Sequence, residues 1–554
     1  MFLMKSIGPG CRRSGLVITI LSLVALSLAS TGTASAQTLS TLASFNGING
    51  TNPYAGLVAD ANGNLFGTTF EGGTANDGAV FEIVKASGGY LSTPTTVVNF
   101  NGTNGSEPAG TPITLIGDAN GNLFGTTAND GASGDGTVFE IVKTSSGYTS
   151  TPTILVNFNG TNGQSPFAGL IGDANGNLFG TTFEGGTAND GTVFEIVKTS
   201  SGYASTPTTL ANFNGTNGAN PYAGLTADAN GNLFGATYAG GEFGAGTVFE
   251  ILNTASGYAS APTTLVNFNG TNGSNPQGAL IADANGNLFG TTYLGGTFGY
   301  GTVFEIVKTS SGYASTLTTL ANFNSSNGAQ PTGTLIADAN GDLFGTTFYG
   351  DPANDGTVFE IVKTSSGYAS TPTTLANFDS TNGANPVAGL IADANGNLFG
   401  TTWRGGASDS GTVFELSGSG FVPFNAFTPF ASFQADLAVT NKQPYGYALV
   451  AGFTTSAANT AINPATVAVT VGIANYTLTI PAGAFQTTWG AYVYQGKING
   501  VATYALLIPL GRNRYAFAVA GSPDNLSTTA NPVTVSLTIG SNGGTSQVNA
   551  AQVP

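Results

Sequence analysis

The sequence contains no histidine and only one cysteine among its 554 residues. The absence of histidine excludes Ser-His-Asp triads, imidazole acid-base catalysis and histidine metal ligands. Cys11 lies in an N-terminal segment that we expect to be removed, so the mature protein is expected to have no disulfide and no thiolate nucleophile. Any catalysis would have to use carboxylates, tyrosine, lysine, arginine or hydroxyl groups.

Charge is also scarce, because charged residues make up only 8% of the chain. The 29 acidic residues outnumber the 13 basic ones and give a net charge of −16. Such a surface repels phosphate backbones and anionic lipids, so we expect no nucleic-acid partner. Beyond the first 36 residues no stretch is long and apolar enough to cross a membrane as a helix, and the mature chain is expected to have no membrane span.

Residues 1–36 have the pattern of a signal peptide. Lys5 and two arginines precede an apolar stretch over residues 16–28, and small residues end the segment at Ala36. This order of basic, apolar and small residues is typical of a secretory leader. We therefore predict cleavage before Gln37 and a secreted or cell-surface protein.

An internal repeat dominates the rest of the chain. The block DANGNLFGTT, with small variations, occurs seven times with one step of 58 residues and five of 55, starting at Asp60, Asp118, Asp173, Asp228, Asp283, Asp338 and Asp393. A second block, G(T/A)VFE(I/L), keeps the same register and carries Glu82, Glu140, Glu195, Glu250, Glu305, Glu360 and Glu415. Such a period indicates stacked copies of one structural unit.

Each repeat predicts four short strands, which in the third copy cover residues 169–171, 177–182, 192–198 and 208–214. The Asn-Gly of each DANGN block predicts a hairpin turn, since both residues tolerate positive φ. Residues 192–197 are mainly apolar on both faces of the strand, which is typical of a sheet between two neighbouring sheets. The fold class is therefore all-β.

The phase of the repeats favours a closed ring over an open solenoid. A copy of the fourth-strand motif, Leu42–Phe45, comes before the first complete unit, and no copy follows the last VFEL block at Ser417. If the N-terminal strand pairs with the segment around Val413, residues 37–420 form a seven-bladed β-propeller without an unpaired edge.

The DANGNLFGTT and GTVFE blocks resemble the tandem repeats of the choice-of-anchor GloVer-containing family of bacterial secreted proteins. The resemblance covers about residues 38–416. It implies a bacterial, exported protein and no particular reaction. After Phe421 the period stops, and short alternating runs predict an immunoglobulin-like β-sandwich over residues 421–554.

Two repeated acidic patterns receive structural interpretations. Asp60, Asn62 and Asn64 alternate as in a calcium loop, but Leu65 occupies the place where an EF-hand needs glycine. We therefore expect plain Asx turns, no bound metal and no cofactor. Identical third-strand glutamates in seven equivalent places indicate architecture, because catalytic acid and base roles need carboxylates in unlike environments.

The residue after FGTT supplies the candidate ligand contacts. Six repeats carry an aromatic there and the second carries Ala128, the aromatics being Phe70, Phe183, Tyr238, Tyr293, Phe348 and Trp403. Aromatic faces can stack on sugar rings, and they can equally pack between blades. Trp403 and Arg404 break the symmetry of the repeats and are the best single candidates for a polar ligand.

These features favour a non-enzymatic extracellular or cell-surface binding or adhesion protein, with an extracellular polysaccharide or a surface protein as partner. One alternative is a carbohydrate-active hydrolase or lyase that uses carboxylates or tyrosine on the propeller face. Another is a structural matrix protein. No catalytic residue is assigned.

Overall fold

The structure is a computed structural model. It describes residues 37–423 except 61, 109–114 and 351–352, together with the strands that lie between Thr428 and Val553. The chain separates into two compact units, one of residues 36–421 and one that includes residues 422–554. All regular elements in the described residues are strands, and none of them is a helix able to span a bilayer.

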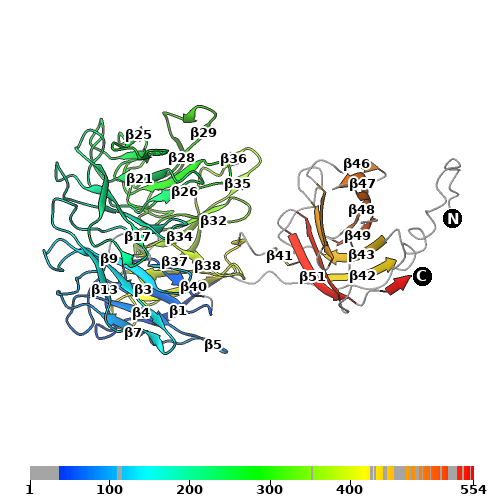
Figure 1. Ribbon diagram of the computed structural model, residues 1–554, viewed down its shortest axis with the longest axis horizontal. Coiled ribbons are helices and arrows are strands. Elements are labelled where there is room, and N and C mark those ends of the chain that lie inside the picture. The colour runs from blue at the N-terminus through cyan, green and yellow to red at the C-terminus, as the bar shows by residue number, and fades with distance from the viewer. Residues whose placement is uncertain are drawn as a thin grey trace. The chain divides into compact units, whose positions relative to one another are not determined.

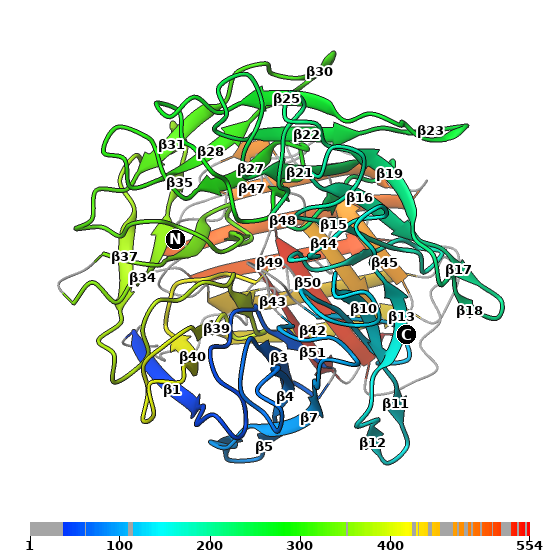
Figure 2. The same cartoon turned by 90° about the vertical axis from the view of Figure 1, so that its left-hand side faces the viewer.

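The first unit is a ring of seven four-stranded antiparallel sheets, as the repeat predicts (Figures 1 and 2). The innermost strands are β2 (Val58–Ala59), β8 (Ile116–Gly117), β14 (Ile171–Gly172), β20 (Thr226–Ala227), β26 (Ile281–Ala282), β32 (Ile336–Ala337) and β38 (Ile391–Ala392). The second strands are β3 (Leu65–Thr69), β9 (Leu123–Thr127), β15 (Leu178–Thr182), β21 (Leu233–Thr237), β27 (Leu288–Thr292), β33 (Leu343–Thr347) and β39 (Leu398–Thr402).

The third strands are β4 (Ala79–Ile83), β10 (Thr137–Ile141), β16 (Thr192–Ile196), β22 (Thr247–Ile251), β28 (Thr302–Ile306), β34 (Thr357–Ile361) and β40 (Thr412–Ser417). The outer strands are β7 (Thr95–Asn99), β13 (Thr153–Asn157), β19 (Thr208–Asn212), β25 (Thr263–Asn267), β31 (Thr318–Asn322), β37 (Thr373–Asn377) and β1 (Thr38–Ser44). We number the blades 1 to 7 from β2 onward.

The N-terminal strand closes the ring. β1 pairs antiparallel with β40, in a register that runs from Thr38 opposite Ser417 to Ser44 opposite Thr412. In Figure 2 the dark blue β1 lies beside the yellow β40, although the two strands are far apart in sequence. The predicted pairing near Val413 is confirmed, since this residue lies opposite Ala43. The seven-bladed propeller is thus closed by both ends of the repeat region.

The interior strands of each blade are buried and tightly packed. In blade 3 all five residues of β15 are buried, and so are four of the five in β16. Gly180 is required on β15, because a Cβ there would lie 2.6 Å from Cζ of Phe194. Phe194 in turn packs edge-on against Phe158 with ring centroids 5.1 Å apart. Burial on both faces explains why these strands lack the usual alternation of polar and apolar residues.

The third strand is shorter than predicted, and a small hairpin follows it. In blade 3 the strand ends at Ile196, and Lys198–Thr199 pairs with Gly202–Tyr203. Thr199 Oγ1 accepts from the N–H of Ser201, which tightens the turn. The six hairpins are β5 (Lys85–Ala86) with β6 (Gly89–Tyr90), β11 (Lys143–Thr144) with β12 (Gly147–Tyr148), β17 (Lys198–Thr199) with β18 (Gly202–Tyr203), β23 (Asn253–Thr254) with β24 (Gly257–Tyr258), β29 (Lys308–Thr309) with β30 (Gly312–Tyr313), and β35 (Lys363–Thr364) with β36 (Gly367–Tyr368).

Each hairpin joins its blade to the preceding one. Tyr203 of blade 3 contacts Phe124 of blade 2 with ring centroids 5.5 Å apart, and Nζ of Lys198 lies 5.1 Å from the centroid of the Tyr203 ring. Blade 7 continues into residues 418–421 instead, and there Phe421 packs against Phe344 of blade 6 at 5.1 Å. Phe421 therefore takes the place that a hairpin tyrosine has in the other blades.

The second unit contains two further sheets. One has the order β41-β51-β50-β44-β45 and consists of β41 (Thr428–Pro429), β51 (Asn542–Val548), β50 (Val533–Ile539), β44 (Val469–Ile473) and β45 (Tyr476–Ile480). The other has the order β46-β47-β48-β49-β43-β42-β52 and consists of β46 (Gln486–Thr488), β47 (Ala491–Ile498), β48 (Val501–Gly511), β49 (Arg514–Gly521), β43 (Gly446–Thr454), β42 (Ser432–Thr440) and β52 (Ala551–Val553). The immunoglobulin-like sandwich stays a prediction.

Candidate binding site on the loop face

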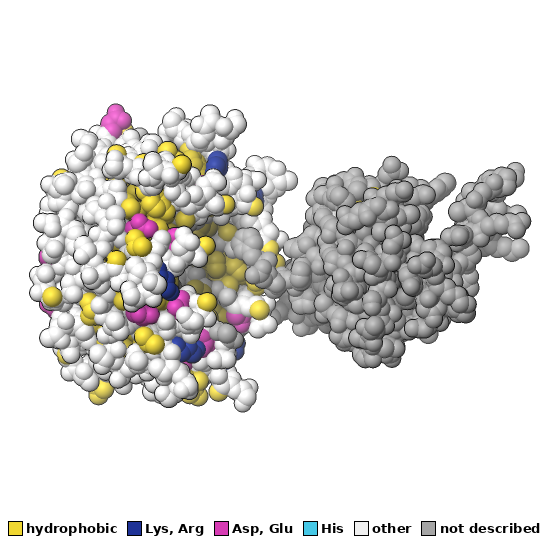
Figure 3. Space-filling model, viewed as in Figure 1, with side chains coloured by type: hydrophobic (Ala, Val, Ile, Leu, Met, Phe, Trp, Pro, Cys, Tyr) yellow, Lys and Arg dark blue, Asp and Glu magenta, His cyan; other side chains and the backbone are white. Residues whose placement is uncertain are grey.

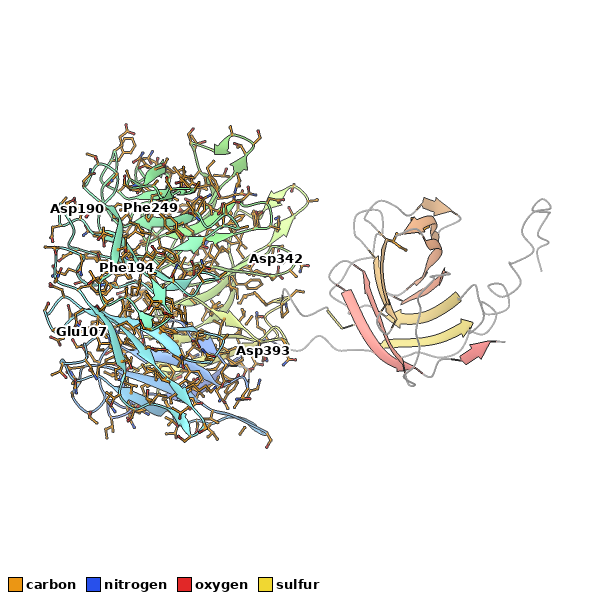
Figure 4. All side chains as sticks on the ribbon, in the orientation of Figure 1. Glu107, Asp190, Phe194, Phe249, Asp342 and Asp393 are labelled. Atoms are coloured by element: carbon orange, nitrogen blue, oxygen red, sulfur yellow. The ribbon has the colours of Figure 1, made fainter. Side chains whose placement is uncertain are left out.

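The two faces of the ring carry different connections. We call loop face the side formed by the loops between second and third strands and by the connections from each outer strand to the next inner strand. The hairpin face carries the Asn-Gly turns and the six hairpins. Figure 4 shows Glu107 and Asp190 on the loop face, Phe194 and Phe249 inside the ring, and Asp342 and Asp393 on the hairpin face.

A residue in left-handed conformation fixes each connection on the loop face. Asn52 has φ of 54°, a value that asparagine accepts more readily than most residues. Its carbonyl accepts from the N–H of Phe70 at 3.0 Å, and its side-chain amide donates to the carbonyl of Trp403 in blade 7 at 3.0 Å. Asn220, Asn275 and Asn385 bridge neighbouring blades in the same way. The residues that follow are thereby held at the mouth of the ring.

These connections and the FGTT aromatics enclose a cavity of about 340 Å³. Its walls come from blades 1, 3, 4 and 7 and consist of Asn52, Tyr54, Phe70, Glu71, Phe167, Tyr222 and Trp403. The Tyr54 ring lies 6.0 Å from Phe70 and 6.3 Å from Trp403, measured between centroids. The Tyr54 side chain is also hydrogen-bonded to Tyr222. Five aromatic rings, one amide and one carboxylate thus face one hollow.

The cavity presents neutral hydroxyl groups. Burial raises the pKa of Tyr54, while the hydrogen bond to Tyr222 lowers it by a smaller amount. Burial likewise raises the pKa of Tyr222, and the nearby Tyr54, Tyr238 and Tyr293 add to that rise. Both phenols therefore stay protonated over the physiological range and can donate or accept hydrogen bonds. The guanidinium carbon of the exposed Arg404 lies 4.4 Å from the Trp403 ring centroid, outside the cavity lining.

A second symmetry break lies beside this cavity. In blade 2 Glu107 occupies the place of Asn52, and its carboxylate accepts from the Asn129 amide at 2.5 Å. Burial is the largest cause that raises the Glu107 pKa, and Glu71 adds to the rise, whereas the bond from Asn129 lowers it. The loop face around blades 1 and 2 is therefore acidic.

The structure places all six candidate aromatics on the loop face, each half-buried. Phe70 and Trp403 line the cavity, and Phe348 contacts Trp403 at 5.9 Å. Phe183 and Tyr238 contact the cavity residue Tyr222 at 5.6 and 6.2 Å. Five of these rings thus contact or line the cavity region, and their role as ligand contacts stays a prediction.

Five cavity residues were not among the sequence candidates, namely Asn52, Glu71 and the three aromatics Tyr54, Phe167 and Tyr222. The three aromatics share one sequence position. Each follows the proline of an (N/S)-P-x-A-G segment just before an inner strand. The signal was present, since x is aromatic in these blades but is Gln277, Thr332 or Val387 in blades 5, 6 and 7. The residue after the proline is therefore a place where otherwise similar repeats present different side chains.

The repeated aspartates on the hairpin face form hydrogen bonds within their own Asn-Gly turns. Asp60 Oδ1 accepts from the N–H groups of Asn62 and Asn64, both at 2.9 Å, which makes a plain Asx turn. Lys143 of blade 2 forms an ion pair with Asp60 at 3.6 Å. Burial raises the pKa of Glu82, Asp60 adds to the rise, and Lys143 lowers it. In the described part of the chain no group of three Asp, Glu, His or Cys side chains is arranged to hold a metal.

A sequence-family model described as the Gloeobacter/Verrucomicrobia repeat matches residues 29–249, 203–414 and 263–468. The chain belongs to this repeat family. Among curated proteins none matches the sequence.

The central channel of this repeat protein is a separate apolar hollow of about 270 Å³, lined mainly by glycine, alanine, leucine and isoleucine.

Solved structures with distant similarity are themselves varied. A glucose dehydrogenase is 12% identical with a TM-score of 0.34, and the match covers 68% of this chain and 98% of that one. The Bacteroides ovatus xyloglucan PUL GH43B is 12% identical with a TM-score of 0.27, covering 92% of both chains. A PL25 ulvan lyase is 11% identical with a TM-score of 0.26, covering 93% and 96%. At such scores these likenesses say nothing about the activity of this chain.

Proposed function

We propose that this protein is a non-enzymatic, secreted or cell-surface glycan-binding protein, and that its site is the aromatic cavity on the loop face. The ligand is an extracellular polysaccharide built of neutral sugars. The second unit, as a β-sandwich, serves as a support or attachment module. The observation that carries the proposal is the convergence of five aromatic rings from four blades on one hollow.

The chemistry of the lining fits a neutral sugar. Aromatic faces give apolar contact to the C–H surfaces of a sugar ring, and the protonated hydroxyls of Tyr54 and Tyr222 can bond its hydroxyl groups. Asn52 and Glu71 add an amide and a carboxylate. An acidic sugar would meet repulsion from Glu71 and from the nearby Glu107.

The cavity favours binding over catalysis. Glycoside hydrolysis uses two carboxyl groups that flank one bond and differ in their environments. Among the residues that line the cavity, Glu71 is the single carboxylate. The second carboxyl partner that a hydrolase needs has no counterpart in this lining.

The test measures binding of a panel of neutral and acidic oligosaccharides to the full chain and to Trp403→Ala. Loss of one cavity ring should weaken binding of the preferred neutral sugar by about tenfold, a change of roughly 1.4 kcal/mol. Leu91→Ala is the matched control, because Leu91 is exposed on the hairpin face. Equal binding by Trp403→Ala and the native protein would refute the site. Release of shortened or unsaturated sugars during incubation would replace a binding function by an enzymatic one.

A further inference from the structure

The loops of blades 4 and 5 carry three exposed aromatic side chains, and the loop of blade 6 carries one, Tyr349. Phe243 and Phe298 are 57% and 55% exposed, and Tyr300 is 43% exposed. The position of Phe243 and Phe298 holds only small residues in the other five blades, namely Ala75, Ser133, Ala188, Ala353 and Ser408. Each of these two phenylalanines leaves more than half of its surface exposed to solvent, in two adjacent repeats, and can contact a ligand there.

The same two blades lack an aspartate near the end of this loop. Four blades carry one directly before the glycine that leads into the third strand, at Asp77, Asp135, Asp190 and Asp355, and blade 7 has Asp409 followed by Ser410. Blades 4 and 5 have Ala245 and Tyr300 there and no aspartate beside it. Glu242 is the one acid in these two loops, and neither loop contains lysine or arginine. This sector of the loop face is therefore aromatic and nearly uncharged, between acidic neighbours. Charged side chains are also sparse on the side of the ring visible in Figure 3.

A series of tyrosines connects this sector with the cavity. Tyr222 lines the cavity and lies 6.2 Å from Tyr238 of the same blade. Burial is the main cause that raises the pKa of Tyr293 in blade 5, and the neighbouring Tyr349, Tyr238 and Tyr54 raise it further. Aromatic hydroxyl groups thus extend from the cavity over blades 4 and 5 toward blade 6.

We propose that the exposed aromatics of blades 4 and 5 continue the cavity as a track for the extended chain of a neutral polysaccharide. The cavity holds one end or one bend of the chain, and Phe243 and Phe298 stack on sugar units further along it. This inference rests on the proposed glycan-binding function and specifies its ligand as a long chain. An anionic lipid surface would find no cation in these two loops to attract it.

The track predicts that affinity increases with chain length. The probes are disaccharides and hexasaccharides of the cello, xylo and manno series, measured by calorimetry on the full chain. Phe243→Ala combined with Phe298→Ala should weaken hexasaccharide binding by about tenfold and leave disaccharide binding unchanged. Trp403→Ala should weaken both. The matched control is Leu252→Ala combined with Val307→Ala, because these exposed apolar residues belong to the same two blades and lie on the hairpin face.

The outcomes separate the track from the site. Disaccharide binding that needs Trp403 but does not improve with chain length would reject the track and keep the glycan site. Hexasaccharide binding that is insensitive to the paired Phe243 and Phe298 substitutions would reject the track as well. A change in sedimentation caused by these substitutions, without a change in sugar affinity, would assign the patch to self-association and overturn the proposal. Absence of binding by every probe would overturn both proposals.

Discussion

Replacing Phe45 by alanine should destabilise the whole ring, although this residue lies near the start of the repeat region. Phe45 directly follows β1 and is 1% exposed. Its ring packs edge-on against Phe81 of blade 1 with centroids 4.9 Å apart, and its N–H donates to the carbonyl of Gly411 in blade 7. A buried Phe→Ala change costs about 3–5 kcal/mol through lost burial and the remaining cavity. Here that cost falls on the interface that closes the ring.

Phe213→Ala supplies the matched control. Phe213 follows the outer strand of blade 3, is fully buried, and contacts Phe249 at 5.0 Å in the same edge-on geometry. If the ring is closed as described, urea unfolding followed by circular dichroism should give similar losses for the two variants. A loss below about 1 kcal/mol for Phe45→Ala, beside a full loss for Phe213→Ala, would show that the closing strand is not docked in solution. Deletion of residues 38–46 should go further and expose β40 as a free edge.

Three further predictions concern the blades. Asp342→Asn restores the asparagine that the six other blades have at this place. Burial and the carboxylates of Asp342 and Asp338 raise the pKa of Glu360 to about 7. The folded protein therefore holds this proton more tightly than the unfolded chain, and the free energy of unfolding should fall as pH rises from about 4.5 through 7. After allowance for solvent screening, we expect a loss on the order of 1 kcal/mol. The asparagine variant should flatten this slope in thermal melts at pH 5 and pH 8, and an unchanged slope would refute the assignment to Glu360. Tyr203→Ala removes the ring that contacts Phe124 and the cation of Lys198, and should lower the free energy of unfolding in urea by about 1–2 kcal/mol. Tyr203→Phe keeps the ring and should keep most of the stability. Equal losses for the two variants would contradict a role for the ring. Gly180→Ala should cost about 1–3 kcal/mol because its Cβ would collide with Phe194, and a neutral result in the same assay would mean that the blade interior can relax.

The architecture could be predicted because the repeats are nearly identical. Seven copies in one register reveal the number of blades, and the displaced fragment Leu42–Phe45 reveals how the ring closes. Burial on both faces follows from apolar residues on both faces of residues 192–197. These inferences use short-range patterns and the requirement that no strand edge stays unpaired, so they need no knowledge of contacts between blades.

The contacts between blades could not be predicted in the same way. The sequence predicts that the third strand runs to residue 198, whereas it ends at Ile196 and the following residues form a hairpin that reaches the preceding blade. The recurring Tyr203 position has a partner about 80 residues earlier in the chain, at Phe124, and no local pattern shows that distance. Tyr54 and Tyr222 are separated by three blades in sequence and meet only because the ring brings their connections to one mouth.

The two faces of the ring use their side chains differently, and this difference supports the proposed position of the binding site. On the hairpin face the hairpin side chains contact the preceding blade, as Lys143 of blade 2 does with Asp60 and Tyr148 of blade 2 does with Phe66. A change at one of these positions disturbs two blades, so the positions have little freedom to acquire a ligand. On the loop face the backbone and Asn52-type amides hold the blades together, which leaves the residue after the proline and the residue at Phe243 free to vary. The first of these positions is aromatic in blades 1, 3 and 4, and the second is aromatic in blades 4 and 5. The bonds that join the blades on this face do not require an aromatic ring at either position, so we expect the proposed ligand contacts there.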